Sequence, residues 1–457
     1  MKKLFQWAFA MMLVVPSMCF VSCSDDDPET TSTGDSELPN NPNSPMDGNA
    51  MTSVEQKEKL EAVALEVARL VPAEDFRQIE SLGRYIGETY FDDYDWDDVE
   101  DWADDIFDGL KRYLTSTRED DYWGAYIYDN YRVLVAASNF KGHFTAQNGR
   151  WIKSNANDLQ FIFKDRAGAE CRLILEISGT TKDVYVGDID DYKDWEFING
   201  KYIDYYDRYQ LTISVPEHIV VTLTQNGSNV VKANVDIDLK SISANNEFNF
   251  ATNSLTVSSN VVLNNGYVFK ASQVAYTANS KASASCSVSK NGTMIVSMSV
   301  AADVSGIPNC NLSAFTADPE DFDWDDANGK NALVKVDVLG KVQMQGTLTD
   351  IRSFANSLDD ADANDENENK FKQYINKANS LADVNLFYDN SSTKQAKVTL
   401  EPFEEKDYYG SYWTVEPTIN FNDGSSYSFD MFFNKTDFKE VIDAYEKLCE
   451  DYENMVE

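Results

Sequence analysis

Apolar residues recur at intervals of three and four between residues 51 and 118, which is the spacing of one helix face. Ser53 and Gln56 have the spacing of a capping box, so a helix is expected to begin there. Three series carry the helical period: Leu60, Val63, Val67, Leu70 and Val71, then Phe76, Ile79, Leu82 and Ile86, then Trp96, Val99, Trp102, Ile106, Leu110 and Leu114. The pattern predicts a helical unit over residues 51–118.

From about residue 125 the apolar positions change to a period of two, which is the period of a β-strand. One segment alternates Ala233, Val235, Ile237 and Leu239 with Lys232, Asn234, Asp236 and Asp238. Asn-Gly pairs, a strong signal for tight hairpin turns, occur at 148–149, 199–200, 226–227, 265–266 and 291–292. We predict an antiparallel β-meander over residues 119–340, with one face in the core and the other in water.

Residues 341–457 mix both periods. Helical spacing over 351–358 and 371–381 flanks an acidic segment, 384–433 returns to hairpins, and 438–452 has the pattern of a closing amphipathic helix. The predicted class is therefore α+β, with an N-terminal helical unit, a long antiparallel β-meander, and C-terminal hairpins and helices.

Two parts of the predicted meander resemble each other at an offset of 65 residues, with Asn226-Gly227 matching Asn291-Gly292. The match extends from Val221 to Asp238 in one part and from Cys286 to Asp303 in the other. An internal duplication and two similar hairpins of one sheet explain it equally well.

The amino terminus has the pattern of an export signal. Lys2 and Lys3 precede an apolar run over 4–15, which is shorter than the ~20 apolar residues of a membrane-spanning helix. Residues 1–22 are therefore predicted to be a signal peptide. Residues 28–50, rich in Thr, Ser, Asn, Pro and Gly without an apolar period, predict a flexible tether.

The segment Phe20-Val21-Ser22-Cys23 resembles the lipobox of bacterial lipoproteins, although Leu is more usual than Phe at its first position. An acidic run over 24–29 follows, and it is similar to the export tag of Bacteroidetes-type surface lipoproteins. The resemblance implies that the chain is cut before Cys23 and that Cys23 carries acyl chains such as palmitate. Residues 23–50 would then be a lipidated tether on the outer membrane, with the body exposed at the cell surface. The resemblance implies no activity.

The charge of the chain excludes one class of partner. Lys and Arg number 39 against 77 Asp and Glu, a formal net charge of −38. Nucleic acid needs a basic footprint, and the sequence contains no basic cluster of useful size. The 42% of hydrophobic residues nevertheless indicates a folded body.

Little in the sequence indicates catalysis. It has two histidines, His143 and His218, which we interpret as hydrogen-bonded residues of strands. Nucleophile-elbow, P-loop and dinucleotide-binding motifs are absent, and two S-x-x-K matches at 287–290 and 391–394 lie at expected turns. Acidic runs around 97–108 and 321–325 are interpreted as solvated surface. We predict no catalytic, cofactor or metal site.

Four cysteines lie beyond the export signal, and their spacing predicts neither a zinc site nor a redox pair. They are Cys171, Cys286, Cys310 and Cys449. Disulfides among them and buried free thiols are both compatible with the sequence.

Aromatic residues gather beside acidic ones in two stretches interpreted as loops, 121–131 and 192–209. Rings beside carboxylates are typical of carbohydrate sites, whereas packing within a sheet would account for the same residues. The candidate ligand-binding residues are Trp123, Tyr126, Trp195 and Tyr202.

Three hypotheses follow from these features. The first is a non-catalytic surface protein that binds a glycan or a protein ligand. The second is a lipid carrier whose sheet encloses a cavity. The third is a glycosidase with paired carboxylates ~5 to 9 Å apart.

Overall fold

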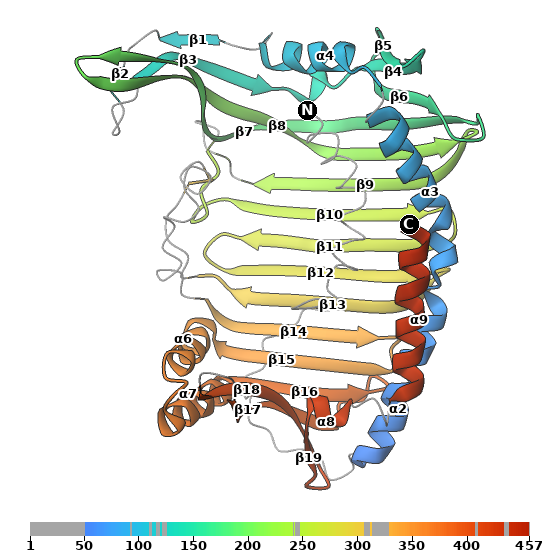
Figure 1. The fold of residues 1–457 in the computed structure, drawn as a ribbon, viewed down its shortest axis with the longest axis vertical. Coiled ribbons are helices and arrows are strands. Elements are labelled where there is room, and N and C mark those ends of the chain that lie inside the picture. Colours follow the sequence, from blue (N-terminus) through green and yellow to red (C-terminus); the bar gives the residue numbers. More distant parts are fainter. Residues whose placement is uncertain are drawn as a thin grey trace.

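One large, mostly antiparallel open sheet makes up most of the described chain, and helices pack on it to give an α+β fold (Figure 1). The structure is a computed structural model, and it describes residues 51–91, 94–108, 112–115, 119–120, 126–240, 242, 247–305, 311–312, 329–406, 410–433 and 438–456. The predicted signal peptide and tether lie outside these residues. The predicted α+β class is confirmed.

The helices occupy both ends of the described chain and one segment between strands. They are α2 (Ser53–Leu70), α3 (Arg77–Ile86), α4 (Asp97–Asp108), α6 (Ile351–Asp362), α7 (Glu368–Leu381), α8 (Phe429–Phe432) and α9 (Lys439–Val456), with the 3-10 helices η1 (Ala73–Phe76) and η3 (Ala137–Asn139) and the π-helix η2 (Gly87–Phe91). The capping box of α2 is formed by Thr52 and Glu55, one residue before the predicted pair. Gln56 instead is buried and donates to the carbonyl of Gln395.

The strands follow one another along the chain. They are β1 (Arg112–Thr115), β2 (Glu119–Asp120), β3 (Tyr126–Val135), β4 (Gly142–Gln147), β5 (Arg150–Ser154), β6 (Leu159–Lys164), β7 (Glu170–Ile198), β8 (Lys201–Gln225), β9 (Ser228–Lys240), β10 (Ser254–Leu263), β11 (Tyr267–Thr277), β12 (Lys281–Lys290), β13 (Thr293–Asp303), β14 (Lys330–Val338), β15 (Val342–Asp350), β16 (Ala382–Tyr388), β17 (Ala396–Lys406), β18 (Ser411–Phe421) and β19 (Ser426–Ser428). From β7 to β19 each strand pairs antiparallel with the next.

Two features of the first strands differ from the prediction. The third predicted helix ends at Asp108 and not near Leu114, because Arg112–Thr115 is a strand whose Tyr113 pairs with Tyr131 of β3. In addition, β3 pairs parallel with β8, and β4 pairs parallel with β6. A parallel pair needs a crossover connection, and short-range turn signals do not reveal it.

Most of the Asn-Gly pairs form the tight turns that were predicted. Asn226 and Gly227 have φ angles of 51° and 76°, and the pairs at 148–149, 199–200 and 291–292 have similar values. Positive φ at both positions is the signature of a type I′ turn. The pair at 265–266 differs, because only Gly266 has a positive φ, of 90°. A Cβ atom there would lie 2.0 Å from the side-chain oxygen of Asn291, so this turn requires glycine.

The two faces of the sheet have the predicted polarity. In β9, Ala233 and Leu239 are buried, whereas Lys232, Asp236 and Asp238 on the other face are exposed. The alternation is confirmed because it matches the strand period. The apolar face carries the main core cluster.

The hairpins β8–β9 and β12–β13, which contain the predicted sequence match, share an irregularity as well as a turn. The register shifts between Leu223 and Thr224 in one hairpin, and between Val288 and Ser289 in the other. The extra residues opposite these shifts are Val230 and Ile295, and both side chains are buried. The repeated spacing therefore encodes a β-bulge as well as a tight turn.

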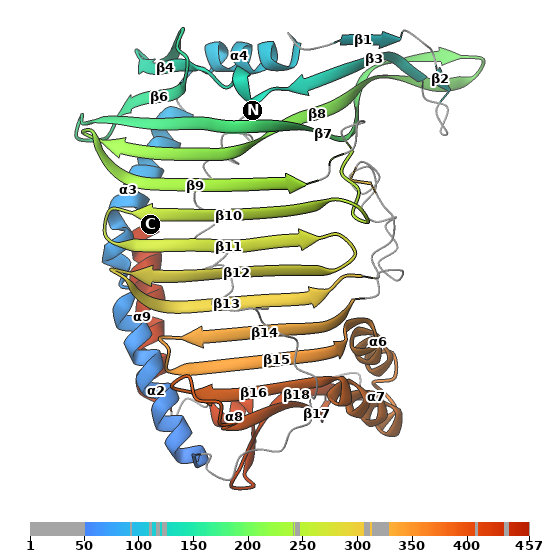
Figure 2. The same ribbon diagram turned by 180° about the vertical axis from the view of Figure 1, so that it is seen from behind.

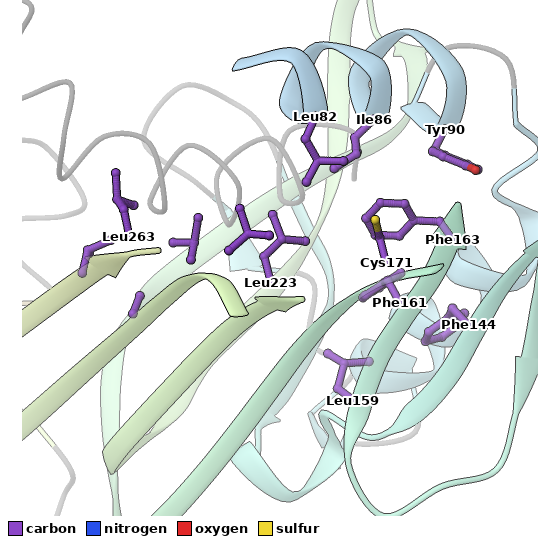
Figure 3. Packing of buried hydrophobic residues seen from close by; sticks show 14 of the residues in the cluster. Leu82, Ile86, Tyr90, Phe144, Leu159, Phe161, Phe163, Cys171, Leu223 and Leu263 are labelled. Atoms are coloured by element: carbon purple, nitrogen blue, oxygen red, sulfur yellow. The ribbon is translucent and has the colours of Figure 1, made fainter. Parts of the chain in front are cut away.

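Helices cover the apolar face at one end of the strands. In Figures 1 and 2, α2, α3 and α9 run across the strands along one margin of the sheet, and α6 and α7 lie at the opposite margin. Figure 3 shows Leu82 and Ile86 of α3 and Tyr90 of η2 above residues of the first strands. The rings of Tyr90 and Phe163 lie 5.3 Å apart. This contact places η2 against β6.

A polar group, which we call the Asp75 cluster, fastens the helices to the sheet. It consists of Asp75 on η1, Tyr267 on β11 and Lys290 on β12. The Tyr267 hydroxyl lies 2.6 Å from the carbonyl oxygen of Leu70 and 2.7 Å from the Asp75 carboxylate, and Lys290 Nζ lies 2.5 Å from the same carboxylate. Burial, together with the Asp75 charge, raises the pKa of Tyr267 above its usual value. The hydroxyl therefore remains a hydrogen-bond donor at neutral pH.

Candidate functional site

The candidate site lies on the hairpin of β7 and β8, which extends past the ends of the neighbouring strands (Figures 1 and 2). The strands are 29 and 25 residues long and are joined by the Asn199-Gly200 turn. We call residues 188–208 the hairpin tip. The register of β7 shifts between Tyr192 and Asp194, which marks a bulge within it.

Aromatic side chains gather on one face of the hairpin tip. Phe197 pairs with Tyr202, and Trp195 pairs with Asp204 two positions further along. The ring of Tyr202 lies 4.9 Å from that of Phe197 and 5.0 Å from that of Trp195. These side chains are 50% (Trp195), 61% (Phe197) and 71% (Tyr202) exposed. Large apolar side chains clustered in solvent mark a binding surface more often than a packing surface.

A second aromatic pair continues the same face toward the sheet. Tyr192 and Tyr206 are paired in register, with ring centroids 5.7 Å apart. Burial and the neighbouring charges of Asp204 and Asp194 raise the pKa of Tyr192. Asp204 therefore lies near both groups of rings. We use the name aromatic platform for the three rings at the turn (Trp195, Phe197 and Tyr202), the Tyr192–Tyr206 pair and Asp204.

Ion pairs fix the charged side chains around the aromatic platform. Arg208 makes two parallel hydrogen bonds to Asp190, of 2.8 and 2.9 Å, and lies 3.7 Å from Asp188. Lys193 lies 2.5 Å from Asp191 and 3.6 Å from Asp207. Hydrogen bonding to Asp191 raises the pKa of Lys193, so this lysine stays charged over the physiological range.

The structure brings together two of the four predicted ligand-binding residues. Trp195 and Tyr202 are in contact, and they lie in continuous strands and not in loops as predicted. The loop interpretation was wrong because the acidic residues are poor strand formers by themselves, and cross-strand pairing overrides this preference. Trp123 lies outside the described residues, and of Tyr126 only the backbone at the start of β3 is described.

Alternation within the strands places the residues of the aromatic and acidic stretch 192–209 on two different faces of the hairpin. Tyr205 and Asp207 are buried, and they alternate with exposed Tyr202 and with Asp204 and Tyr206, which are half-buried. Phe197 was missed, although it lies two positions from Trp195 and therefore on its face. The two aromatic stretches are adjacent in space, because Tyr131 of β3 stacks on Tyr209 of β8 at 5.3 Å.

The histidines and the S-x-x-K lysines have structural partners. His143 Nε2 lies 2.9 Å from Asp158, and His218 Nδ1 lies 2.7 Å from Asp236, which confirms both as hydrogen-bonded strand residues. Hydrogen bonds from Gln160 and His143 lower the pKa of Asp158. Lys290 belongs to the Asp75 cluster, and Lys394 Nζ lies 3.0 Å from Asp383.

Metal ligands do not gather among the residues that the structure describes. Within those residues, no group of three or more His, Cys, Asp or Glu side chains could hold a metal ion. On α4, the charge of Asp95 raises the pKa of Asp97, which shows the repulsion between neighbouring acids. The acidic run around 321–325 lies outside the described residues.

Two of the cysteines differ in their accessibility to solvent. Cys171 and Cys449 are free thiols, Cys171 buried and Cys449 exposed, whereas Cys310 lies outside the described residues. Burial, together with the Asp165 charge, raises the pKa of Cys171 to about 11. A thiol with that pKa is a weak nucleophile at neutral pH, because the thiolate is the reactive form.

We therefore expect a maleimide at pH 7 to modify Cys449 and to leave Cys171 unmodified in the folded protein. The expected thiolate fraction of Cys171 is about one in ten thousand at that pH. Peptide mass spectrometry would measure the labelling, and unfolding in urea should expose Cys171 as the control. Equal labelling of both thiols before unfolding would contradict the burial of Cys171.

Comparisons with protein-family models, with curated proteins and with solved structures gave no match. Among the described helices, none is long and apolar enough to cross a membrane.

Proposed function

We propose that the protein is a surface-anchored, non-catalytic lipoprotein that binds a glycan on the aromatic platform of the β7–β8 hairpin. The observation that carries the proposal is the mutual contact of Trp195, Phe197 and Tyr202 in solvent at the hairpin tip. These rings are exposed although an aromatic side chain gains ~1.5–3 kcal/mol on burial. Such a surface is suited to a ligand with an apolar face.

Sugars fit such a surface because one side of the ring presents C–H groups and its edge presents hydroxyl groups. The aromatic rings supply apolar contact, and Asp204 supplies carboxylate oxygens that accept hydrogen bonds from hydroxyls. The rings already contact one another, so little side-chain freedom remains to be lost on binding.

The predicted anchor suits this use of the hairpin. Acyl chains on Cys23 and a tether of some 25 residues would hold the body at a typical distance of roughly 25 to 30 Å from the membrane. A hairpin that extends beyond the sheet can then contact a polymer outside the cell. The open sheet favours this proposal over a lipid carrier, which needs an interior enclosed by strands.

The proposal predicts that Trp195→Ala combined with Tyr202→Ala weakens glycan binding at least about tenfold, since an aromatic anchor contributes ~1–2 kcal/mol or more. Affinity electrophoresis on a panel of polysaccharides would measure the binding. Phe403→Ala is the matched control, because Phe403 is 47% exposed on the separate hairpin β17–β18. Its retention should equal that of the wild type.

Retention that is unchanged in the double variant would overturn the proposal. Circular dichroism should show wild-type folding in both proteins, because the replaced side chains are exposed. We expect no hydrolysis of any polysaccharide that binds. Turnover would favour the glycosidase hypothesis instead.

A further inference from the structure

We infer that the glycan bound by the hairpin tip is electrically neutral, a specification that rests on the proposed function. The first reason is the charge of the hairpin tip. It holds seven acidic residues, namely Asp188, Asp190, Asp191, Asp194, Glu196, Asp204 and Asp207, and three basic ones, namely Lys193, Lys201 and Arg208, so 3 − 7 gives a net charge of −4. A ligand bearing carboxylate or sulfate groups is repelled by this field.

The second reason is that two of the three cations, Lys193 and Arg208, are already neutralised, whereas Lys201, which alternates with Tyr202, lies on the face of β8 opposite the rings. Arg208 donates hydrogen bonds from Nε and Nη2 to the two carboxylate oxygens of Asp190. Lys193 lies between Asp191 and Asp207. An anionic sugar could reach either cation only by displacing a carboxylate. Recognition of carboxylate or sulfate groups normally uses an Arg or Lys that the ligand itself neutralises.

The third reason is the hydrogen-bonding character of the aromatic platform. Asp204 stands between the rings at the turn and the Tyr192–Tyr206 pair. An ionised carboxylate only accepts hydrogen bonds, and so it selects hydroxyl donors and rejects other acceptors. Neutral sugars present many such donors.

The aromatic platform also has the shape for a chain of sugars. From Tyr202 to Tyr206 it covers four residue steps of β8, or ~14 Å at 3.4 Å per residue. The paired positions Phe197–Tyr202, Trp195–Asp204 and Tyr192–Tyr206 follow one another along the hairpin. The ligand is therefore expected to lie along the hairpin as an extended polymer.

The test compares polymers that share a backbone and differ in charge. Affinity electrophoresis of the purified full chain would use hydroxyethyl cellulose, mixed-linkage β-glucan, galactomannan and methyl-esterified pectin as neutral probes. Carboxymethyl cellulose is the anionic counterpart of hydroxyethyl cellulose, and polygalacturonate is that of fully methyl-esterified pectin. We expect at least one neutral polymer to be retained, with an affinity that changes less than twofold between 10 and 150 mM NaCl. The anionic counterparts should bind at least tenfold more weakly at 10 mM NaCl, where screening is least.

A variant separates the electrostatic effect from the contacts. Asp194→Asn combined with Glu196→Gln removes two charges from the hairpin tip while keeping the size of both side chains. Since Glu196 alternates with Trp195 and Phe197, it lies on the opposite face from the rings. Binding of the neutral polymer should stay within twofold of the wild type, and binding of the anionic counterpart should increase at least threefold.

Two outcomes of this test distinguish failure of the inference from failure of the proposed function. An anionic polymer that binds at least as tightly as every neutral one, and is lost on Trp195→Ala with Tyr202→Ala, would overturn the inference and leave the proposed function standing. Binding of any polymer that is unchanged in the aromatic double variant would overturn the proposed function itself.

Discussion

Replacing Cys23 with alanine should move the protein from the membrane fraction to the soluble fraction and abolish its labelling by palmitate. Each buried CH₂ group of an acyl chain contributes ~0.8 kcal/mol to membrane binding, so two or three chains anchor the protein stably. A protein without acyl chains is not anchored. Metabolic labelling with palmitate, followed by membrane fractionation, would measure both effects.

Cys19→Ala is the matched control for this experiment. Cys19 lies four residues earlier, within the predicted signal peptide, and its replacement should leave labelling and fractionation unchanged. A Cys23→Ala protein that still incorporates palmitate, or that still sediments with membranes, would contradict the predicted anchor. The surface location would then lose its basis, whereas the geometry of the hairpin tip would be unaffected.

Asp75→Ala should lower the free energy of unfolding by about 2–3 kcal/mol, because it leaves a buried hydroxyl and a largely buried ammonium group without their shared carboxylate. Lys290 is 20% exposed and Tyr267 is fully buried, so water compensates little for the loss. Urea denaturation followed by near-ultraviolet circular dichroism would measure the change.

Glu74→Ala is the control, because Glu74 precedes Asp75 and forms an exposed ion pair of 2.6 Å with Arg77. Its loss should cost no more than ~0.5 kcal/mol. Adding Lys290→Met to Asp75→Ala should recover part of the stability, since it removes the unpaired cation. Equal destabilisation by Asp75→Ala and Glu74→Ala would show that the Asp75 cluster does not fasten the helices to the sheet.

Local features of the fold could be predicted where one short segment contains the whole signal. The period of three to four residues predicted α2 and α3, and the turn at Asn226-Gly227 was identified from two residues. The faces of β9 followed from the alternation between Ala233 and Lys232. These features depend on residues that are neighbours in the chain, so a short stretch of sequence is enough to predict them.

Features that depend on distant partners were not predicted. The parallel pairing of β3 with β8 joins residues about 80 positions apart, such as Tyr131 and Tyr209, with four strands between them in the chain. The strand character of the acidic segment around Asp190 likewise depends on its partner Arg208. Composition correctly drew attention to Trp195 and Tyr202, but only the register showed that Phe197 belongs with them.

The packing of the first helix against the last has a consequence for biogenesis. The hydroxyl of Tyr445 in α9 donates to the carbonyl of Ala64 in α2, across 381 positions of the chain. Contacts at such separation form late, since loop closure costs more entropy as the loop lengthens. A nascent polypeptide therefore lacks the partner of α2 until α9 has been synthesised. We expect α2 to remain undocked from its partner helix until α9 has emerged from the ribosome.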